Sequence, residues 1–206
     1  YSVTVSMFKS KEIRWFTRQE NKHISSWFAE KGQTFENISA RTDHYLLAPG
    51  HDDVAPKLRE GNIEIKHRIG KAVKHQLTDN VEGYFEEYIK WSFKLQSSDR
   101  ASRQIIEHKK YANEWQEVYK ERMGLLLTEE NGSTKIREMK EHVNSGCQIE
   151  YTRIKVKGET WYSFNLEWFG DEFIHPGSSL LHEIMGDSVF KLQDSMGYGS
   201  FLQSKK

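Results

Sequence analysis

The sequence predicts an α+β fold in which eight antiparallel strands close into a barrel, or tunnel, with helices packed outside it. Two observations lead to this prediction. Apolar and polar residues alternate with period 2 in eight short segments, as the two faces of a strand require. Three other segments repeat apolar residues at helical spacing. Eight strands are enough to close a barrel, and a length of 206 residues suits a single domain over residues 1–206.

The strand segments follow one another at short intervals. In the fourth segment, Ile63 and Ile65 alternate with Glu64 and Lys66, and the fifth, YFEEYIKWSFKL, alternates in the same way. A hairpin-type turn with an Asn-Gly core follows the sixth segment, and Gly158 lies between the last two, which predicts an antiparallel pair. The predicted strands span residues 12–16, 41–47, 57–60, 62–68, 84–95, 115–127, 147–157 and 160–170.

Three segments predict helices. The first places Ile24 and Phe28 one helical turn apart and stops at Gly32. The second begins with Ser and Asp, which are good N-cap residues, and the third follows Pro176 and Gly177 and carries an apolar stripe. The predicted helices span residues 21–31, 98–112 and 178–196.

Composition narrows the class of protein. Lys plus Arg and Asp plus Glu both number 30, so the net charge is zero and binding to nucleic acid by bulk electrostatics is not expected. The single cysteine, Cys147, excludes an internal disulfide and favours a reducing, cytoplasmic setting, with the thiol as a core residue. There is no apolar run of membrane-spanning length, the mean hydropathy is −0.78, and the start YSVTVSMFKS lacks the form of a signal peptide, so no membrane partner is expected. A monomer and a homodimer stay equally open.

The polar faces of the predicted strands are charged on nearly every strand. If helices cover the apolar faces, the charged faces converge on the barrel interior. Buried like charges repel one another and lose hydration, so such an interior is costly unless it binds an anion. Arg and Lys suit phosphate oxygens. The residues predicted to bind phosphate or another small anion are Arg14, Arg41, Lys57, Arg59, Lys66, Arg68, Lys90, Lys120 and Arg122.

Carboxylates share these faces. Glu64, Glu150 and Glu167 offer the hard oxygen ligands that Mg²⁺ and Mn²⁺ accept, so either ion is an expected cofactor. The alternative is that each charged stripe is the solvated face of an open antiparallel sheet.

Six short stretches, in order along the chain, resemble the CYTH superfamily, also called the triphosphate tunnel metalloenzymes. This group includes class IV adenylyl cyclases, thiamine triphosphatases and inorganic triphosphatases. The resemblance covers about residues 12–202. The stretches are R-T-D-x-Y-L at 41–46, K-L-R-E-G-x-I-E-I-K-x-R at 57–68, K-x-R at 120–122, I-E-Y-T at 149–152, L-E-x-F-G at 166–170 and S-x-x-Y at 195–198.

The resemblance implies an eight-stranded antiparallel tunnel with outer helices. Its lumen would hold a triphosphate on Lys and Arg and a divalent metal on Glu. The resemblance assigns roles by position. It places Arg41 on the strand that leads into a pair of basic residues typical of the family. That pair is Lys57 and Arg59, and Lys66 is the lysine of the next strand. Lys120 and Arg122 match the later basic pair, and Glu150 and Glu167 match the late acidic metal ligands.

The first strand departs from the family's E-x-E-x-K pattern. The matching residues are Glu12, Arg14 and Phe16, so only Glu12 remains as a predicted metal ligand there. Exchanging a carboxylate for a cation weakens the affinity for a divalent metal, which in the family assists attack on a phosphoryl group. Two functions therefore stay open, with a cyclase as a third. One is a metal-dependent phosphohydrolase that acts on a tri- or polyphosphorylated small molecule. The alternative is a non-catalytic tunnel that binds an anionic or phosphorylated ligand.

Overall fold

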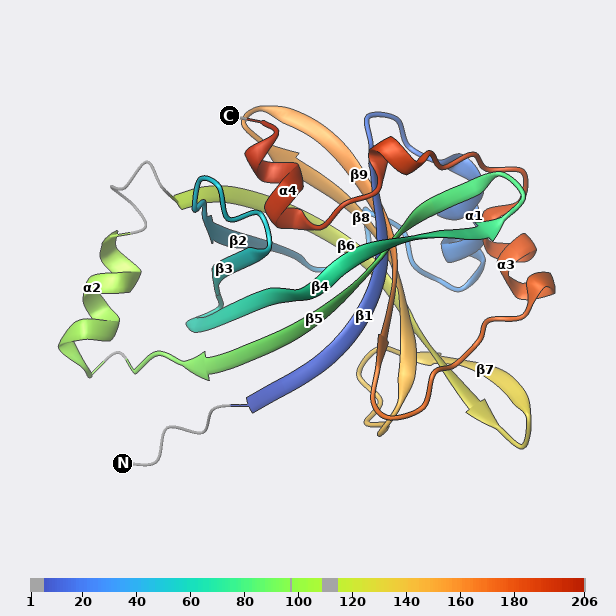
Figure 1. The fold of residues 1–206 in the computed structure, drawn as a ribbon, viewed down its shortest axis with the longest axis horizontal. Helices are drawn as coiled ribbons and strands as arrows, with labels where there is room; N and C mark the ends of the chain where they lie inside the picture. Colours follow the sequence, from blue (N-terminus) through green and yellow to red (C-terminus); the bar gives the residue numbers. More distant parts are fainter. Residues whose placement is uncertain (1–5, 97, 109–114, 206) are drawn as a thin grey trace.

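A computed structural model describes residues 6–96, 98–108 and 115–205 and shows one antiparallel sheet closed on itself (Figure 1). The strands follow the order β2-β3-β4-β5-β1-β9-β8-β6, and β2 also pairs with β6 to complete a ring of eight. The predicted fold class, an α+β barrel with helices outside, is confirmed. The strands are β1 (Ser6–Thr17), β2 (Ala40–Leu46), β3 (Val54–Arg59), β4 (Asn62–Thr78), β5 (Val81–Lys94), β6 (Trp115–Glu130), β7 (Ser133–Glu138), β8 (Gly146–Val156) and β9 (Glu159–Phe169).

Several strands extend beyond their predicted bounds. β4 continues to Thr78 because it forms a long hairpin with β5, although its outer part is exposed on both faces and therefore lacks alternation. β7 is a ninth strand that the sequence does not predict. It leaves the Asn131-Gly132 turn, in which both residues have positive φ, and pairs with β6 outside the ring. Its side chains are mostly exposed, so no apolar period marks it.

The helices are α1 (Lys22–Glu30), α2 (Arg100–His108), α3 (Ser178–Met185) and α4 (Tyr198–Gln203), with a 3₁₀ turn at Leu192–Asp194. The side chain of Asn21 caps α1 by accepting a hydrogen bond from the backbone N–H of Ile24 at 3.0 Å. For the second predicted helix, residues 109–112 lie outside the described residues. The third prediction is wrong beyond Met185, because Gly186 adopts a φ of 53° and ends the helix.

The main core lies outside the barrel, between the sheet and two helices. α1 and α3 pack together against the outward faces of β1, β6, β8 and β9 (Figure 1). Trp15 and Phe164 lie there with stacked rings 6.2 Å apart, and both are fully buried. Cys147 belongs to this core, as predicted from the sequence. Burial raises the pKa of its thiol. This core fixes which face of each strand points inward.

A second apolar cluster fills one end of the barrel interior. Phe16 of β1 stacks on Phe201 of α4 with ring centroids 3.8 Å apart, and Tyr45, Val118 and Ile154 pack beside them. Phe16 is 3% exposed. The aromatic residue at the end of EIRWF therefore has a packing role, and α4 closes this end of the barrel.

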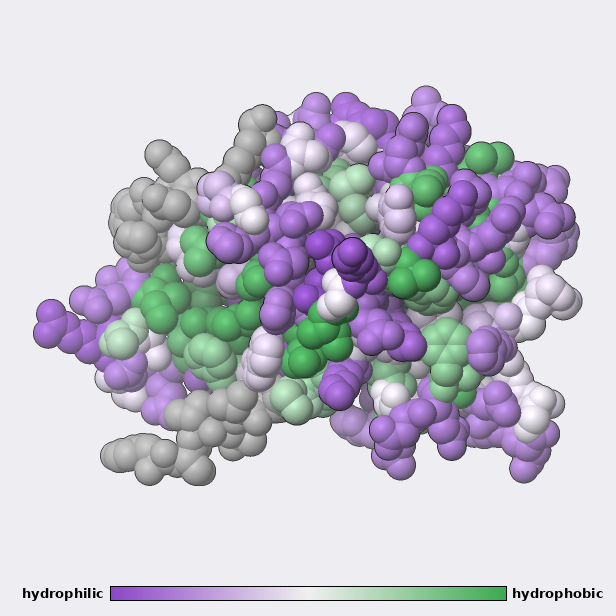
Figure 2. All heavy atoms as spheres, viewed as in Figure 1, coloured by the Kyte–Doolittle hydropathy of each residue, from purple (hydrophilic) through white to green (hydrophobic). Residues whose placement is uncertain are grey.

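The outward face of β4 and β5 is less covered than that of β1 and β9. Ile63, Ile65, Trp91 and Phe93 lie on it and are only half-buried. Figure 2 shows hydrophobic side chains gathered over this part of the molecule, whereas hydrophilic side chains dominate around it. Among the described residues, no helix is long and apolar enough to cross a membrane.

Candidate functional site

A chamber of about 460 Å³ lies inside the barrel, beside the cluster formed by Phe16 and Phe201. Its wall contains 12 of the 13 residues predicted to bind an anion or a metal. The register explains this convergence, because residues directly opposite on neighbouring strands share a face: Glu12 pairs with Glu167. The predicted residues in the wall are Glu12, Arg14, Arg41, Lys57, Arg59, Glu64, Lys66, Lys90, Lys120, Arg122, Glu150 and Glu167.

Arg68 is the predicted residue that does not line the chamber. It lies on the inward face of β4 but donates to Glu86 at 3.0 Å. Glu86 also accepts a hydrogen bond from Tyr88 at 2.5 Å. Arg68 therefore neutralises a buried carboxylate.

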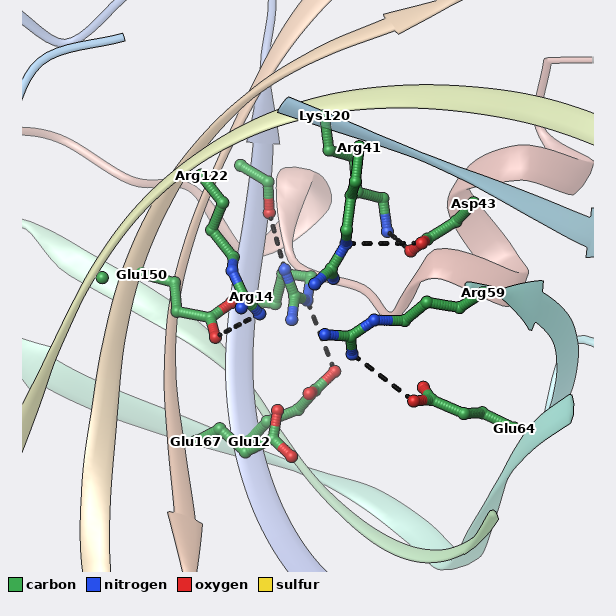
Figure 3. Close-up of polar contacts among 12 residues, drawn as sticks. Glu12, Arg14, Arg41, Asp43, Arg59, Glu64, Lys120, Arg122, Glu150 and Glu167 are labelled. Atoms are coloured by element: carbon green, nitrogen blue, oxygen red, sulfur yellow. Dashed lines mark hydrogen bonds and ion pairs between the residues drawn. The ribbon is translucent and has the colours of Figure 1, made fainter. Parts of the chain in front are cut away.

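Four guanidinium groups approach the centre of the chamber from four different strands (Figure 3). They belong to Arg14 on β1, Arg41 on β2, Arg59 on β3 and Arg122 on β6. Burial and the charge of Arg122 lower the pKa of Arg41, Asp43 opposes this change, and Arg59 adds to it. The arginine pKa still lies far above neutral pH, so the wall carries closely spaced positive charges.

Asp43 is the main counter-charge for one side of this cluster. It is fully buried on β2, with its carboxylate 2.8 Å from Lys120 Nζ, 3.5 Å from Lys57 Nζ and 3.3 Å from Arg41 Nε. Burial raises the pKa of Asp43, but the three cations outweigh this effect and hold the pKa well below its usual range. Lys120 also donates to the hydroxyl of Tyr45 at 2.7 Å, and burial lowers the pKa of Lys120 well below its ordinary value.

A second group of charges centres on Glu12. Its carboxylate contacts Lys66 Nζ closely and lies 3.4 Å from Arg14 Nε. Burial raises the pKa of Glu12, but Lys66 and Arg14 outweigh burial and lower the pKa to about 2. Glu167 lies 3.6 Å from the same Lys66, so one ammonium group serves two carboxylates.

The other two predicted metal ligands also face cations. Glu64 lies 3.1 Å from Lys57 Nζ and 3.4 Å from Arg59 Nη1, while Glu150 lies 3.1 Å from Arg122 Nη1. Among the described residues, no three His, Cys, Asp or Glu side chains come together in a way that could hold a metal ion. As arranged here, the donor set does not fit a divalent cation.

Polar atoms without partners lie close to the charged wall. Both side-chain amide atoms of Asn165 are buried and, within the described residues, accept or donate no hydrogen bond. Asn165 lies directly opposite Arg14 on β1 and Glu150 on β8, which places it on the inward face. Arg41 Nε and Asp43 Oδ1 are likewise unsatisfied, because their 3.3 Å ion pair lacks hydrogen-bond orientation. Buried polar groups usually have partners, so these atoms are exceptions, although neither Asp43 nor Asn165 lines the chamber itself.

Asp43 and Asn165 are missing from the predicted set although the strand period could have found them. Asp43 lies between Arg41 and Tyr45 on one strand face, and Asn165 lies two residues before Glu167. Lys140, Asp52 and Asp53 also line the chamber, but they come from connecting segments, where no period exists. The polar part of the wall is completed by Tyr45, Tyr88, Gln148, Thr152 and Tyr198.

The chamber continues into a more open hollow of about 720 Å³. The two cavities share Arg41, Lys120, Arg122, Met139 and Lys140. Lys140 is exposed and follows β7, so the unpredicted hairpin brings a cation to this opening. Four cations line this hollow against two carboxylates, Glu60 and Glu138, so a negatively charged solute that enters here meets net positive charge.

Comparison with known proteins found no matching family model, no matching curated protein and no matching solved structure.

Proposed function

We propose that the chamber binds a small molecule that carries a tri- or polyphosphate group or a comparable multiply charged anion. The observation that carries this proposal is the charge of the wall. Nine Lys and Arg residues line it against six Asp and Glu residues, an excess of three positive charges when every group is ionised. Asp43, buried behind Lys120, reduces the excess to two. A bound polyanion would neutralise this excess and relieve the repulsion around Arg41.

Geometry favours phosphate over a simple halide. Guanidinium groups present planar pairs of N–H donors that match the spacing of phosphate oxygens. Four of them converge in a chamber whose volume of about 460 Å³ suits a small-molecule ligand. The resemblance to the CYTH superfamily supports the same class of ligand, because it implies a barrel whose lumen grips a triphosphate.

Metal-dependent hydrolysis of that ligand is the second candidate. The observation that favours it is the register of β1 and β9, which places Glu12 directly opposite Glu167. These two carboxylates now share Lys66. They are the pair that could approach one Mg²⁺ or Mn²⁺ ion if Lys66 moved away.

Binding can be tested by calorimetry and by thermal unfolding with inorganic triphosphate, pyrophosphate and sulfate at low ionic strength. Triphosphate should raise the melting temperature most, because a ligand of the native state stabilises it. Arg122→Gln should weaken binding about 10- to 100-fold, as expected for a lost charge-assisted contact. Arg137→Gln is the matched control, since Arg137 lies on β7 and pairs with Glu130 and Glu141 outside the chamber.

The proposal would be overturned if the folded protein showed no heat of binding and no rise in melting temperature with any of the phosphate compounds. Phosphate release from triphosphate, nucleoside triphosphates and thiamine triphosphate, each with Mg²⁺ or Mn²⁺, tests the second candidate. Turnover abolished by Glu167→Gln but retained in Glu87→Gln, a surface variant, would establish hydrolysis. Binding without turnover of any of these compounds would reject it.

A further inference from the structure

Arg14 lies in the most acidic part of the chamber wall. Its side chain is 6% exposed, and its guanidinium faces three carboxylates, Glu12, Glu150 and Glu167. Nε lies 3.4 Å from Glu12, and Nη1 donates to the hydroxyl of Ser163 at 3.0 Å. The cation is therefore anchored on two sides while it still lines the chamber.

Aromatic packing fixes the third side of Arg14. Its guanidinium carbon lies 4.8 Å from the ring centroid of Tyr198, at the start of α4, which is a cation–π distance. An arginine guanidinium is not deprotonated in proteins. This charge is therefore permanent, and Glu12, Ser163 and Tyr198 hold it in one place.

A permanent buried cation changes what else can bind among the carboxylates. Lys66 adds a second positive charge beside Glu12. A divalent ion placed there would be repelled by both cations at short range, and the low dielectric of a buried site strengthens that repulsion. The carboxylates also already have partners. The part of the wall that could otherwise take up a metal is thus neutralised from within the chain.

We infer that Arg14 serves as a resident cation in place of a divalent metal, so that the chamber binds its polyphosphate ligand in the metal-free form. This inference rests on the proposed function and specifies it. A polyphosphate in solution exists either free or complexed with Mg²⁺, and the complex carries less negative charge. The chamber, with its own excess of positive charge, selects the free form.

The test is the affinity for inorganic triphosphate measured by calorimetry in EDTA and again with excess Mg²⁺. Wild-type protein should bind more tightly in EDTA, because Mg²⁺ competes for the ligand. The Arg14→Gln variant should bind triphosphate about 10- to 100-fold more weakly than wild type in EDTA. Arg14→Glu should reverse the sign of the Mg²⁺ effect, because it places a second carboxylate two residues from Glu12.

Arg18→Gln is the matched control, since Arg18 follows the same strand but pairs with Glu159 at the surface. Its Mg²⁺ response should equal that of wild type. If Arg14→Gln does not fold, Arg14→Lys keeps the charge and should retain tighter binding in EDTA. Wild-type binding that strengthens with Mg²⁺ would overturn this inference and leave the proposed function standing. A lack of binding in both media would overturn the proposed function itself.

Discussion

Replacing Asp43 by Asn tests how the chamber wall is held together. The substitution keeps the shape of the side chain and removes its charge. In the wild-type protein three cations form ion pairs with this one carboxylate: Lys120 at 2.8 Å, Arg41 at 3.3 Å and Lys57 at 3.5 Å. In the variant they would face one another without it, in a wall that already has more positive than negative charge.

The expected cost follows from burial. The Asp43 side chain is 0% exposed and that of Lys120 is 3% exposed. Removing one partner of a buried ion pair costs about 3–5 kcal/mol, a large part of the roughly 5–15 kcal/mol by which a domain is stable. At about 2–4 °C per kcal/mol for a chain of this size, the melting temperature should fall by roughly 6–20 °C.

Urea unfolding gives the free energy of unfolding, and thermal unfolding gives the melting temperature. Both are followed by circular dichroism, with and without triphosphate. The matched control is Glu87→Gln, which breaks a surface pair with Lys11 at 3.1 Å whose side chains are about half exposed. Such pairs contribute about 0–1 kcal/mol, so the control should unfold almost like wild type. Triphosphate should stabilise the Asp43→Asn variant more than wild type, because it replaces the missing negative charge. A variant as stable as the control would refute the view that Asp43 neutralises the wall.

Three other variants test the carboxylate of Glu12, the close packing at Gly197 before α4, and the contact between Gln33 and the backbone of β6. The pKa of Glu12 is lowered from 4.5 to about 2, so its ionised form adds stability above pH 4.5 that is lost as the pH falls towards 2; Glu12→Gln should flatten the acid-unfolding curve in this window. A Cβ at Gly197 would collide with the hydroxyl of Tyr88, so Gly197→Ala should cost about 1–3 kcal/mol, and Tyr88→Phe should restore part of the melting temperature. The Gln33 side chain forms hydrogen bonds of 2.9 and 2.8 Å with the backbone of Gly124, and Gln33→Ala should cost about 1–3 kcal/mol in urea unfolding; no change in the midpoint would contradict this role.

The strand period explains why most of the fold and most of the chamber wall could be predicted. Glu64 and Lys66 alternate with Ile63 and Ile65, and this pattern alone places the charged side chains on one face. Closure of the sheet then determines that this face points inward. The same period was weak where both faces of a strand are exposed, as in the outer part of β4 and in β7.

Other parts of the site depend on contacts that no local pattern contains. Lys140 reaches the opening only because β7 folds back on β6. Tyr198 lines the chamber because the chain bends at Gly186 and again before α4, where the sequence predicts one continuous helix to residue 196. Arg68 lies on the predicted face of its strand, but it pairs with Glu86 and does not line the chamber. Pairings of this kind are decided by tertiary packing.

The pairing of β2 with β6 also bears on how fast the barrel can form. β2 to β5 follow one another as hairpins, whereas Asp43 and Lys120 are 77 positions apart in the chain. Pairings between such distant segments form slowly, because the entropy of closing a long loop is lost before any contact is gained. In this pairing Arg41 lies directly opposite Lys120, so closing the ring brings two cations together beside one carboxylate. Counter-ions in solution should therefore speed the formation of this pairing.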